Sequence, residues 1–508
     1  MVGEPTRLDP RPARASDPAM PAIRDPAPMP SRPLGRCRRL RAALIALTAL
    51  AAAHGEEVVM DAIVIDARTT VAEQPRARLG INCDYLVDAP AADLTAALRP
   101  LAPAYIRYPG GGKSQTNLWS TPPFARSEPA LARLGPGEWP SCDARLFDLA
   151  AGRFAREPLG FDDFLGVCRD LGAQPTVVVA FDPQYRVAVD GGSVVERERL
   201  IETAVAWVRH ARGAVRWWEL GNETDYLHHY GGTDDAARYA ADVLAFARAM
   251  KAADPTIRIG INGRYAAWWA TVLPLVAADI DFLAVHDYPG WEWAGYDAWL
   301  TRDAAIGVLR IAAEAIDRHA PPEHRARLAI ALTETGVIDW SKKWTPAADL
   351  GHALPLAELV GRLLAEPRLA FFQFWNTRWV DTALGGAEPG PLDAFAADWR
   401  RTPSGDVLAA WAAALRDRLV AVRDAPLVKG FASVGDDGGW TLILLNKDRS
   451  RRVVRVTAEG LDLGLAKRRS FTGTGPEDRA PTWSAEEDVA DLSALELPPV
   501  SMTVVSSR

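Results

Sequence analysis

The chain has 508 residues, 48% of them hydrophobic and 24% charged, which excludes intrinsic disorder or a fibrous repeat for most of its length. At roughly 100 to 200 residues per domain, this length predicts two to four domains. The formal net charge of −7, with no basic block in the folded part, argues against nucleic acid as a partner. The 18 tryptophans indicate either a large core or a ligand that presents flat apolar faces.

The first 53 residues have the composition of a targeting segment. Residues 1–35 are rich in Pro, Arg and Asp without an apolar period, so we expect a disordered extension. The basic stretch 36–41 and the short apolar run 42–53 are typical of a secretory signal peptide, which spans residues 29–53 if translation starts at Met29. We therefore expect a secreted or periplasmic protein with no stable membrane span. An N-terminal anchor or a buried helix is the alternative.

Three cysteines follow the predicted signal peptide, and an odd number permits at most one internal disulfide. Cys142 could pair with either Cys83 or Cys168. The cysteine spacings match no zinc pattern and the eight histidines include no HExxH, so we expect neither a metal nor another cofactor.

From residue 76 to 415 a short apolar run alternates repeatedly with a segment of helical apolar spacing. The predicted strands are residues 79–82, 104–108, 175–181, 215–220, 257–262, 280–286, 328–333 and 369–375. The predicted helices include residues 161–171, 198–212, 234–251, 303–319 and 355–366. Thr233 is the expected N-cap of the helix that starts at Asp234.

Eight such units predict a (β/α)8 TIM barrel of the α/β class over residues 76–415. An open, doubly wound sheet is the rival, but no GxGxxG follows the first strand. The main insertion, residues 112–159, contains Trp119 and Trp139 and has weak periodicity; a loop of this length is usually functional.

The pattern changes after residue 415 to short alternating runs separated by turn residues, which predicts an antiparallel β-sandwich domain over residues 416–508. Its expected strands are residues 427–434, 440–446, 452–457, 467–472 and 500–506. Residues 58–65 alternate in the same way, so segment 54–75 is expected to contribute a further strand to the sandwich.

Carboxylates follow two of the predicted barrel strands. Glu223 comes after the fourth strand and Glu334 after the seventh, and the active site of a TIM barrel lies at these strand ends. Two carboxylates facing each other across the barrel mouth provide what retaining glycoside hydrolysis needs, a nucleophile and an acid that becomes a base. Arg107 and Tyr288 are candidate donors to Glu334, and Asn222 is placed to hold a sugar hydroxyl.

Other polar and aromatic residues at strand ends have less specific interpretations. Trp375 could form the apolar floor beneath a sugar ring. His286 is either a substrate-binding residue or a structural histidine, and Glu219 pairs with Arg216 or with a core residue. His228 and His229 are expected at the surface. Sugar hydroxyls could also bind three aspartates that follow strands, Asp182, Asp225 and Asp287.

Two other enzyme classes are disfavoured by their motifs. Residues 107–114 look like a phosphate loop, but Arg107 stands where glycine is needed and Pro109 removes one backbone N–H. No GxSxG serine motif occurs in the chain.

At these residues the chain resembles the clan A retaining glycoside hydrolases. Residues 218–223, Trp-Glu-Leu-Gly-Asn-Glu, look like the clan's acid/base motif, and Thr333-Glu334 looks like its nucleophile segment. Residues 106–111 are similar to the strand-two segment of the family 51 α-L-arabinofuranosidases, and residues 286–288 to the clan's strand-six segment. Families 51, 39, 30 and 79 also carry the accompanying β-sandwich.

The resemblance has two departures, both of which bear on the substrate. The family 51 enzymes carry a furanose-binding Glu after the first strand, whereas this chain reads Asn82-Cys83-Asp84 there. Their nucleophile is commonly followed by Trp-Asn, whereas Thr335-Gly336 follows Glu334. The substrate is therefore open between an α-L-arabinofuranoside, a β-xyloside, a glucuronide and another plant or bacterial polysaccharide.

These observations predict a glycosidase that acts on an oligo- or polysaccharide by double displacement, with Glu334 as nucleophile and Glu223 as acid/base. A non-catalytic carbohydrate-binding protein on the same barrel is the alternative from another class. A third hypothesis, an open-sheet enzyme with a phosphorylated ligand, requires anion binding at residues 110–114. The linkage, the exo or endo mode and the oligomeric state stay open.

Overall fold

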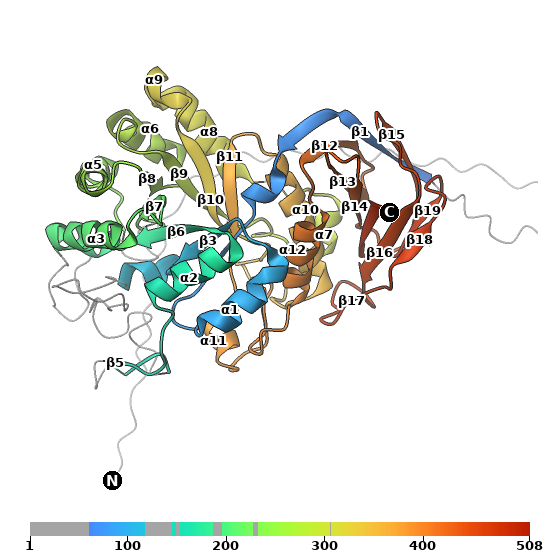
Figure 1. Ribbon diagram of the computed structural model, residues 1–508, viewed down its shortest axis with the longest axis horizontal. Coiled ribbons are helices and arrows are strands. Elements are labelled where there is room, and N and C mark those ends of the chain that lie inside the picture. Colours follow the sequence, from blue (N-terminus) through green and yellow to red (C-terminus); the bar gives the residue numbers. More distant parts are fainter. Residues whose placement is uncertain (1–59, 117–144, 149–152, 186–195, 227–231, 305) are drawn as a thin grey trace, which may run out of the picture. The chain divides into compact units, whose positions relative to one another are not determined.

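The computed structural model describes residues 60–116, 145–148, 153–185, 196–226, 232–304 and 306–508 (Figure 1). The expectations for residues 1–53, and those for Trp119, Trp139, Cys142, His228 and His229, lie outside these ranges. Within them, no helix has both the length and the apolar character needed to cross a membrane.

Eight parallel strands close into a barrel, as the alternating pattern predicts. In spatial order they are β10 (Ala329–Thr335), β11 (Leu369–Phe374), β2 (Gly80–Asn82), β3 (Tyr105–Tyr108), β6 (Gln174–Val179), β7 (Trp217–Leu220), β8 (Arg258–Asn262) and β9 (Phe282–Asp287). Each overlaps one of the eight predicted runs, and closure excludes the open sheet.

Helices surround the barrel strands (Figure 1). The longer ones are α1 (Ala91–Leu98), α2 (Phe161–Leu171), α3 (Arg197–Ala211), α5 (Ala236–Ala253), α6 (Ala266–Val276), α8 (Gly307–His319), α10 (Leu350–Ala365) and α12 (Pro403–Ala414). The prediction that Thr233 caps α5 is wrong. Asp235 is the N-cap, because its side chain accepts the N–H of Arg238, while the Thr233 hydroxyl accepts the N–H of Asp235.

Aromatic side chains fill the lower part of the barrel. Tyr105 stacks on Phe371 with ring centroids 4.0 Å apart, and the Trp217 ring meets Phe282 and Phe371 edge-on. Gly260 makes room for this layer, because a Cβ there would lie 2.1 Å from the Phe282 ring. These packed rings fill the barrel below the carboxyl ends of the strands, the ends at which TIM barrels carry their active sites.

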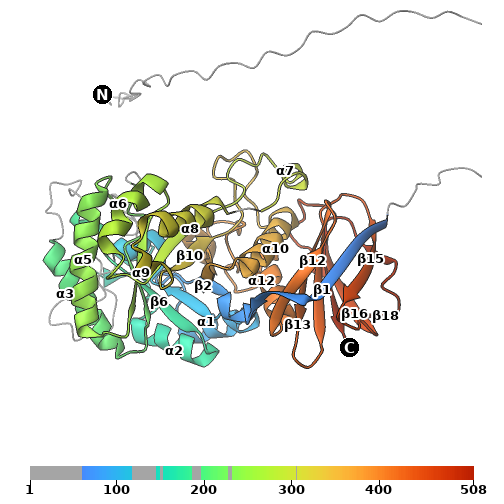
Figure 2. The same ribbon diagram turned by 90° about the horizontal axis from the view of Figure 1, so that it is seen from above.

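Two short strands, β4 (Phe147–Asp148) and β5 (Arg153–Phe154), pair with each other, and ten further strands form a mainly antiparallel sheet. Its members are β1 (Met60–Glu73), β12 (Arg418–Arg423), β13 (Val428–Val434), β14 (Trp440–Asn446), β15 (Arg452–Glu459), β16 (Ala466–Thr472), β17 (Thr482–Trp483), β18 (Glu487–Val489), β19 (Leu495–Leu497) and β20 (Ser501–Ser507). Residues from β1, β13, β14, β15, β16 and β20 share one hydrophobic core, as in a sandwich. The strand β1 lies between β12 and β15, and Figure 2 shows it crossing this part of the sheet.

A buried ion pair joins the barrel helices to the sheet. Lys447, just after β14, lies 3.4 Å from a carboxylate oxygen of Glu358 on α10. The same carboxylate accepts hydrogen bonds from the Trp299 indole at 2.6 Å and from Arg362 at 2.8 Å. Because Lys447 is buried and its carboxylate partner Glu358 belongs to a barrel helix, separating barrel and sheet would leave the Lys447 charge without that partner.

Candidate active site

Alternation along the strands places polar side chains directly above the aromatic floor. Residues two apart point to the same side of a strand, so Arg107 follows Tyr105 into the barrel and Glu219 follows Trp217. Both Arg107 and Glu219 are completely buried. Because buried charges are tolerated only when they are paired, Arg107 and Glu219 must each have partners of opposite charge.

Arg107 binds four side chains from the ends of three strands, β2, β7 and β10. Its Nε and Nη2 donate to the two carboxylate oxygens of Glu219 at 2.9 and 3.1 Å, and Nη1 donates to Glu334 Oε1 at 2.7 Å. The side-chain oxygens of Asn82 and Asn222 accept the remaining hydrogen bonds at 3.0 and 2.9 Å. Burial disfavours the cation, but the two carboxylates outweigh it and raise the pKa of Arg107. The guanidinium is therefore the charge that orients Glu334.

Glu334 is held at both carboxylate oxygens. Oε1 accepts from Arg107, and Oε2 accepts from the Tyr288 hydroxyl at 2.7 Å. Both donors expected from the sequence are thus in contact with Glu334. The side chain is only 7% exposed, and this small exposure faces the cavity. A carboxylate with donors on both oxygens is held in one orientation, as a nucleophile must be.

Glu223 sits on a strained turn after β7. Its φ of 54° lies in the left-handed region, which costs about 1 kcal/mol or more for a residue other than glycine. The turn is fixed by the next residue, because Thr224 donates its N–H to Asn262 at 2.7 Å and its hydroxyl to Asp182 at 2.6 Å. Neighbouring strands therefore support the orientation of Glu223.

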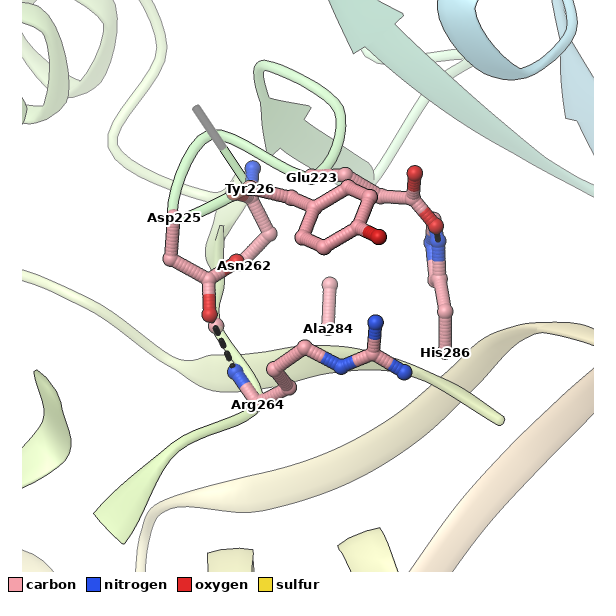
Figure 3. A pocket seen from close by; sticks show the side chains of 8 residues that line it. Glu223, Asp225, Tyr226, Asn262, Arg264, Ala284 and His286 are labelled. Atoms are coloured by element: carbon pink, nitrogen blue, oxygen red, sulfur yellow. Dashed lines mark hydrogen bonds and ion pairs between the residues drawn. The ribbon is translucent and has the colours of Figure 1, made fainter. Parts of the chain in front are cut away.

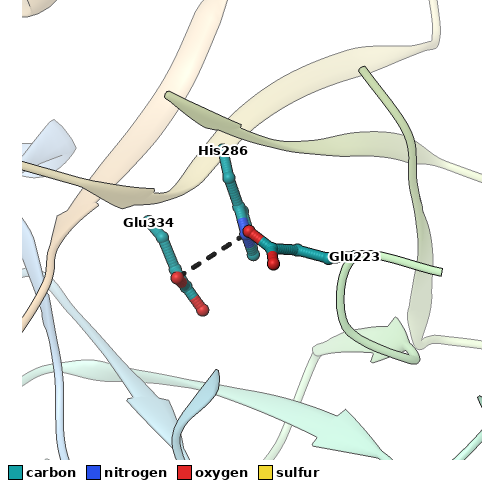
Figure 4. A group of neighbouring side chains, drawn as sticks. All are labelled: Glu223, His286 and Glu334. Carbon is teal, nitrogen blue, oxygen red and sulfur yellow. Dashed lines mark hydrogen bonds and ion pairs between the residues drawn. The ribbon is translucent and has the colours of Figure 1, made fainter. Parts of the chain in front are cut away.

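His286 lies between the two glutamates (Figure 4). Its Nδ1 is 3.0 Å from Glu223 Oε1 and 3.6 Å from Glu334 Oε2, and its Nε2 is 3.0 Å from the Thr333 hydroxyl. Burial works against the protonated ring, but Glu334 and Glu223 outweigh burial and raise the pKa of His286 above its ordinary value of 6.5. A protonated His286 donates to Glu223 through Nδ1 and to Thr333 through Nε2.

The raised pKa of His286 makes part of the stability depend on pH. A raised folded-state pKa contributes stability that is fully present below the unfolded value and is lost as pH rises through the folded value. We expect His286→Asn to lower the free energy of unfolding more at pH 5.5 than at pH 9, as measured by urea denaturation. An equal loss at both pH values would show that the imidazolium is not the stabilising form.

Glu223, His286 and Glu334 open into a cavity of about 390 Å³ at the barrel mouth. Its other lining residues are Gly112, Tyr226, Arg264, Asp287, Tyr288, Trp291, Trp340, Trp375 and Trp379. A smaller recess continues from Glu223 and His286 to Asp225, Tyr226 and Arg264 (Figure 3). The cavity is large enough for a sugar ring and combines aromatic surfaces with carboxylates.

Two groups of tryptophans have different surroundings. Six are completely buried in the core: Trp207, Trp218, Trp269, Trp299, Trp411 and Trp440. Four others line the cavity, and of these Trp291 is 52% exposed and Trp340 and Trp379 are each 37% exposed. Trp375 is 5% exposed and contributes to the cavity wall, where the sequence predicted an apolar floor. Exposed indole rings at a cavity mouth are surfaces on which sugar faces stack.

The donor types of Glu223, His286 and Glu334 could also hold a metal ion, since one potential ligand atom from each lies within 4.8 Å of the others. The surroundings disfavour this interpretation. The Arg107 guanidinium is 2.7 Å from Glu334, and the raised pKa of His286 favours the protonated ring, which cannot bind a metal.

The structure assigns positioning contacts to several predicted substrate-binding residues. Asn222 is buried, and its oxygen accepts from Arg107. Asp182 is completely buried against Thr224 and Gln115, so it does not line the cavity. Glu219 pairs with the buried Arg107, so its partner is a core residue and not Arg216.

A lysine of the loop that resembles a phosphate-binding motif forms an ion pair within the protein. Lys113 binds Asp84, and both side chains are nearly buried. The Lys113 ammonium also lies 5.7 Å from the centre of the Trp375 ring. This pair stands in the region where the family 51 enzymes carry their furanose-binding Glu, so the departure in sequence is also a departure in local charge.

Sequence reasoning missed several cavity residues: Tyr226, Arg264, Trp291, Trp340 and Trp379. All lie in loops after strands, where periodicity carries no signal. Their only sequence cue is the position within a few residues of a strand's carboxyl end, which in a TIM barrel is the active-site face.

No family model matches the chain. The fold is a TIM barrel with a β-sandwich, the class of architecture found in family 51 glycoside hydrolases. One similar structure is an α-L-arabinofuranosidase from Thermotoga maritima in complex with arabinose, with 18% identity and a TM-score of 0.64. Another is a family 51 α-L-arabinofuranosidase from Bifidobacterium longum, with 17% identity and a TM-score of 0.64.

A family 44 xyloglucanase from Paenibacillus polymyxa is similar at 12% identity, with a TM-score of 0.58. Each of the three matches covers 88% of this chain and 99% of the other. The predicted resemblance to clan A enzymes is thus confirmed in the fold. At such low identities the likeness shows the fold alone.

Proposed function

We propose that this protein is a retaining glycoside hydrolase in which Glu334 is the nucleophile and Glu223 the acid/base. The observation that carries this proposal is the approach of the two side chains, with one carboxylate oxygen of each within 4.8 Å of the other at the cavity. Retaining enzymes place their carboxyl groups about 5 to 5.5 Å apart, whereas inverting enzymes need about 6.5 to 9.5 Å to admit a water molecule.

In the first step Glu334 attacks the anomeric carbon and the bond to the leaving oxygen breaks. Arg107 and Tyr288 donate hydrogen bonds to the two oxygens of the attacking carboxylate and hold it in place. Glu223 gives its proton to the leaving oxygen, so the leaving sugar departs as an alcohol.

In the second step Glu223, now a carboxylate, removes a proton from water. The resulting attack on the anomeric carbon breaks its bond to Glu334 and restores both side chains. Each step inverts the anomeric centre, so the product retains the configuration of the substrate. The sequence of proton transfers needs no cofactor.

The stereochemistry of the product tests this mechanism directly. We expect the first anomer seen in a proton NMR time course to have the configuration of the substrate, before mutarotation. The inverted anomer as the first product would contradict the assignment of Glu334. Sugar binding without any release of reducing ends would instead favour a non-catalytic carbohydrate-binding protein.

For the substrate we propose an activity like that of an α-L-arabinofuranosidase, in keeping with the similar solved structures. The Asp84–Lys113 pair and Thr335-Gly336 depart from the family 51 pattern, so a β-xylosidase or glucuronidase type of enzyme is the alternative. A panel of aryl arabinofuranosides, xylosides, glucuronides and galactosides distinguishes these candidates. We also propose that the protein acts outside the cytoplasm, on oligo- or polysaccharides, because residues 29–53 have the pattern of a signal peptide.

A further inference from the structure

An arginine on the cavity wall has no role in the proposed double displacement. Arg264 follows β8 by two residues and lines both the main cavity and the smaller recess. Figure 3 shows its guanidinium turned toward the Tyr226 ring and His286. A guanidinium that is half-buried in a cavity loses hydration, and this cost is usually offset by an anion.

In the described part of the chain, no carboxylate forms an ion pair with the Arg264 guanidinium. The charge of Arg264 acts through space on two acidic residues, Asp225 and Asp287, and both carboxylates also accept hydrogen bonds from the backbone. Asp225 accepts the N–H of Arg264 at 2.7 Å, and Asp287 accepts the N–H of Val308 at 3.4 Å. The guanidinium carbon lies 5.6 Å from the centre of the Tyr226 ring and 5.8 Å from that of Tyr265. These rings steady the arginine but form no ion pair with it.

The position of Arg264 relative to the two glutamates indicates which part of a substrate it meets. The small recess is lined by Glu223, Tyr226, Arg264 and His286, whereas Glu334 and Trp375 line only the main cavity. The leaving sugar must contact the acid Glu223, and the sugar that is attacked must contact Glu334. Arg264 therefore lies on the leaving-group side of the cavity.

We propose that the leaving-group side binds a sugar that carries a carboxylate, a uronate, and that Arg264 is the residue that recognises it. This inference rests on the proposed function, because the assignment of sides uses the roles of Glu223 and Glu334. A planar guanidinium can donate two parallel hydrogen bonds to a carboxylate, which gives orientation as well as charge. Trp291 and Trp340, with ring centroids 6.5 Å apart at the same cavity, offer stacking surfaces to the neighbouring sugar.

Binding in a variant that cannot turn over tests the proposal without relying on hydrolysis. In Glu334→Gln, matched pairs of sugars are titrated by NMR, glucuronate against glucose and galacturonate against galactose. We expect at least one uronate to bind tenfold or more tightly than its neutral partner at low salt, and the ratio to fall toward one in Glu334→Gln/Arg264→Gln. Arg310→Gln, which removes the same charge from an exposed site on α8, should leave the ratio unchanged.

Equal binding of each uronate and its neutral partner, or a ratio insensitive to Arg264, would overturn the proposal. Hydrolysis provides a second test with two kinds of substrate. In one, a neutral sugar is attached to a uronate leaving group; in the other, an aryl uronide, the uronate is the sugar that is attacked. If Arg264→Gln slowed hydrolysis of the aryl uronides alone, the placement of Arg264 on the leaving-group side would be wrong. Uronate binding without any hydrolysis would contradict the glycosidase proposal and the assignment of sides, while leaving Arg264 as an anion site.

Discussion

Replacing Glu334 with glycine is expected to lower kcat by about four to six orders of magnitude, the scale on which loss of a covalent nucleophile acts in other enzymes. The shortened side chain leaves space beside Arg107 and Tyr288, the two donors that hold the carboxylate. Azide can enter this space and attack the anomeric carbon from the same side. We therefore expect azide to restore turnover of an aryl glycoside and to yield the glycosyl azide of inverted configuration.

Glu223→Ala is the matched variant that separates the two roles. It should keep its first step with an aryl leaving group that needs no proton, and azide should then give the product of retained configuration. If Glu334→Gly gave the retained azide and Glu223→Ala the inverted one, the two roles would be reversed. Undiminished activity in Glu334→Gly would refute both assignments. The melting temperature of each variant shows whether the fold is kept.

Replacing Arg107 with methionine is expected to lower the free energy of unfolding by about 3 to 5 kcal/mol, the cost of leaving buried charges without their partner. Glu219 has no exposed surface and two hydrogen bonds to this guanidinium, and Glu334 has one. Arg107→Lys should fall between wild type and methionine, because an ammonium cannot reach four side chains at once. Urea denaturation measures all three proteins.

Arg248→Met provides the control for this experiment. Arg248 also makes two hydrogen bonds to one carboxylate, that of Asp279, but its side chain is 65% exposed. Its loss should cost at most about 1 kcal/mol. Equal losses in the two variants would mean that Arg107 and its partners are better solvated than their burial implies. Partial recovery is expected in Arg107→Met/Glu219→Gln, where one of the two stranded charges is also removed.

The barrel could be predicted from sequence because parallel strands covered by helices are continuous apolar runs. The pairing of Glu223 with Glu334 followed from the same geometry, since the carboxyl ends of all eight strands meet at one face. The role of Glu219 could not be predicted, because its partner Arg107 is 112 residues away. Asp182 has the same position after its strand as Glu223, but its carboxylate accepts a hydrogen bond from the Thr224 hydroxyl. The sequence alone does not distinguish a buried carboxylate from one that lines the cavity.

The cavity residues that lie in loops could not be predicted from the sequence. Arg264, Trp291 and Trp340 are brought to one wall by turns whose course depends on packing between successive units, not on any periodic pattern. A similar limit explains the start of α5, where both Thr233 and Asp235 are good capping residues and both accept backbone hydrogen bonds.

The position of β1 has a consequence for how the protein can be divided. This strand precedes the whole barrel in the chain, yet its residues pair on one side with Arg418–Arg423 and on the other with Arg452–Glu459. A C-terminal fragment would have a missing row in mid-sheet, with open backbone groups on both flanking strands. The two ends of the described chain are therefore joined in one sheet, and neither the barrel nor the sheet is a detachable module.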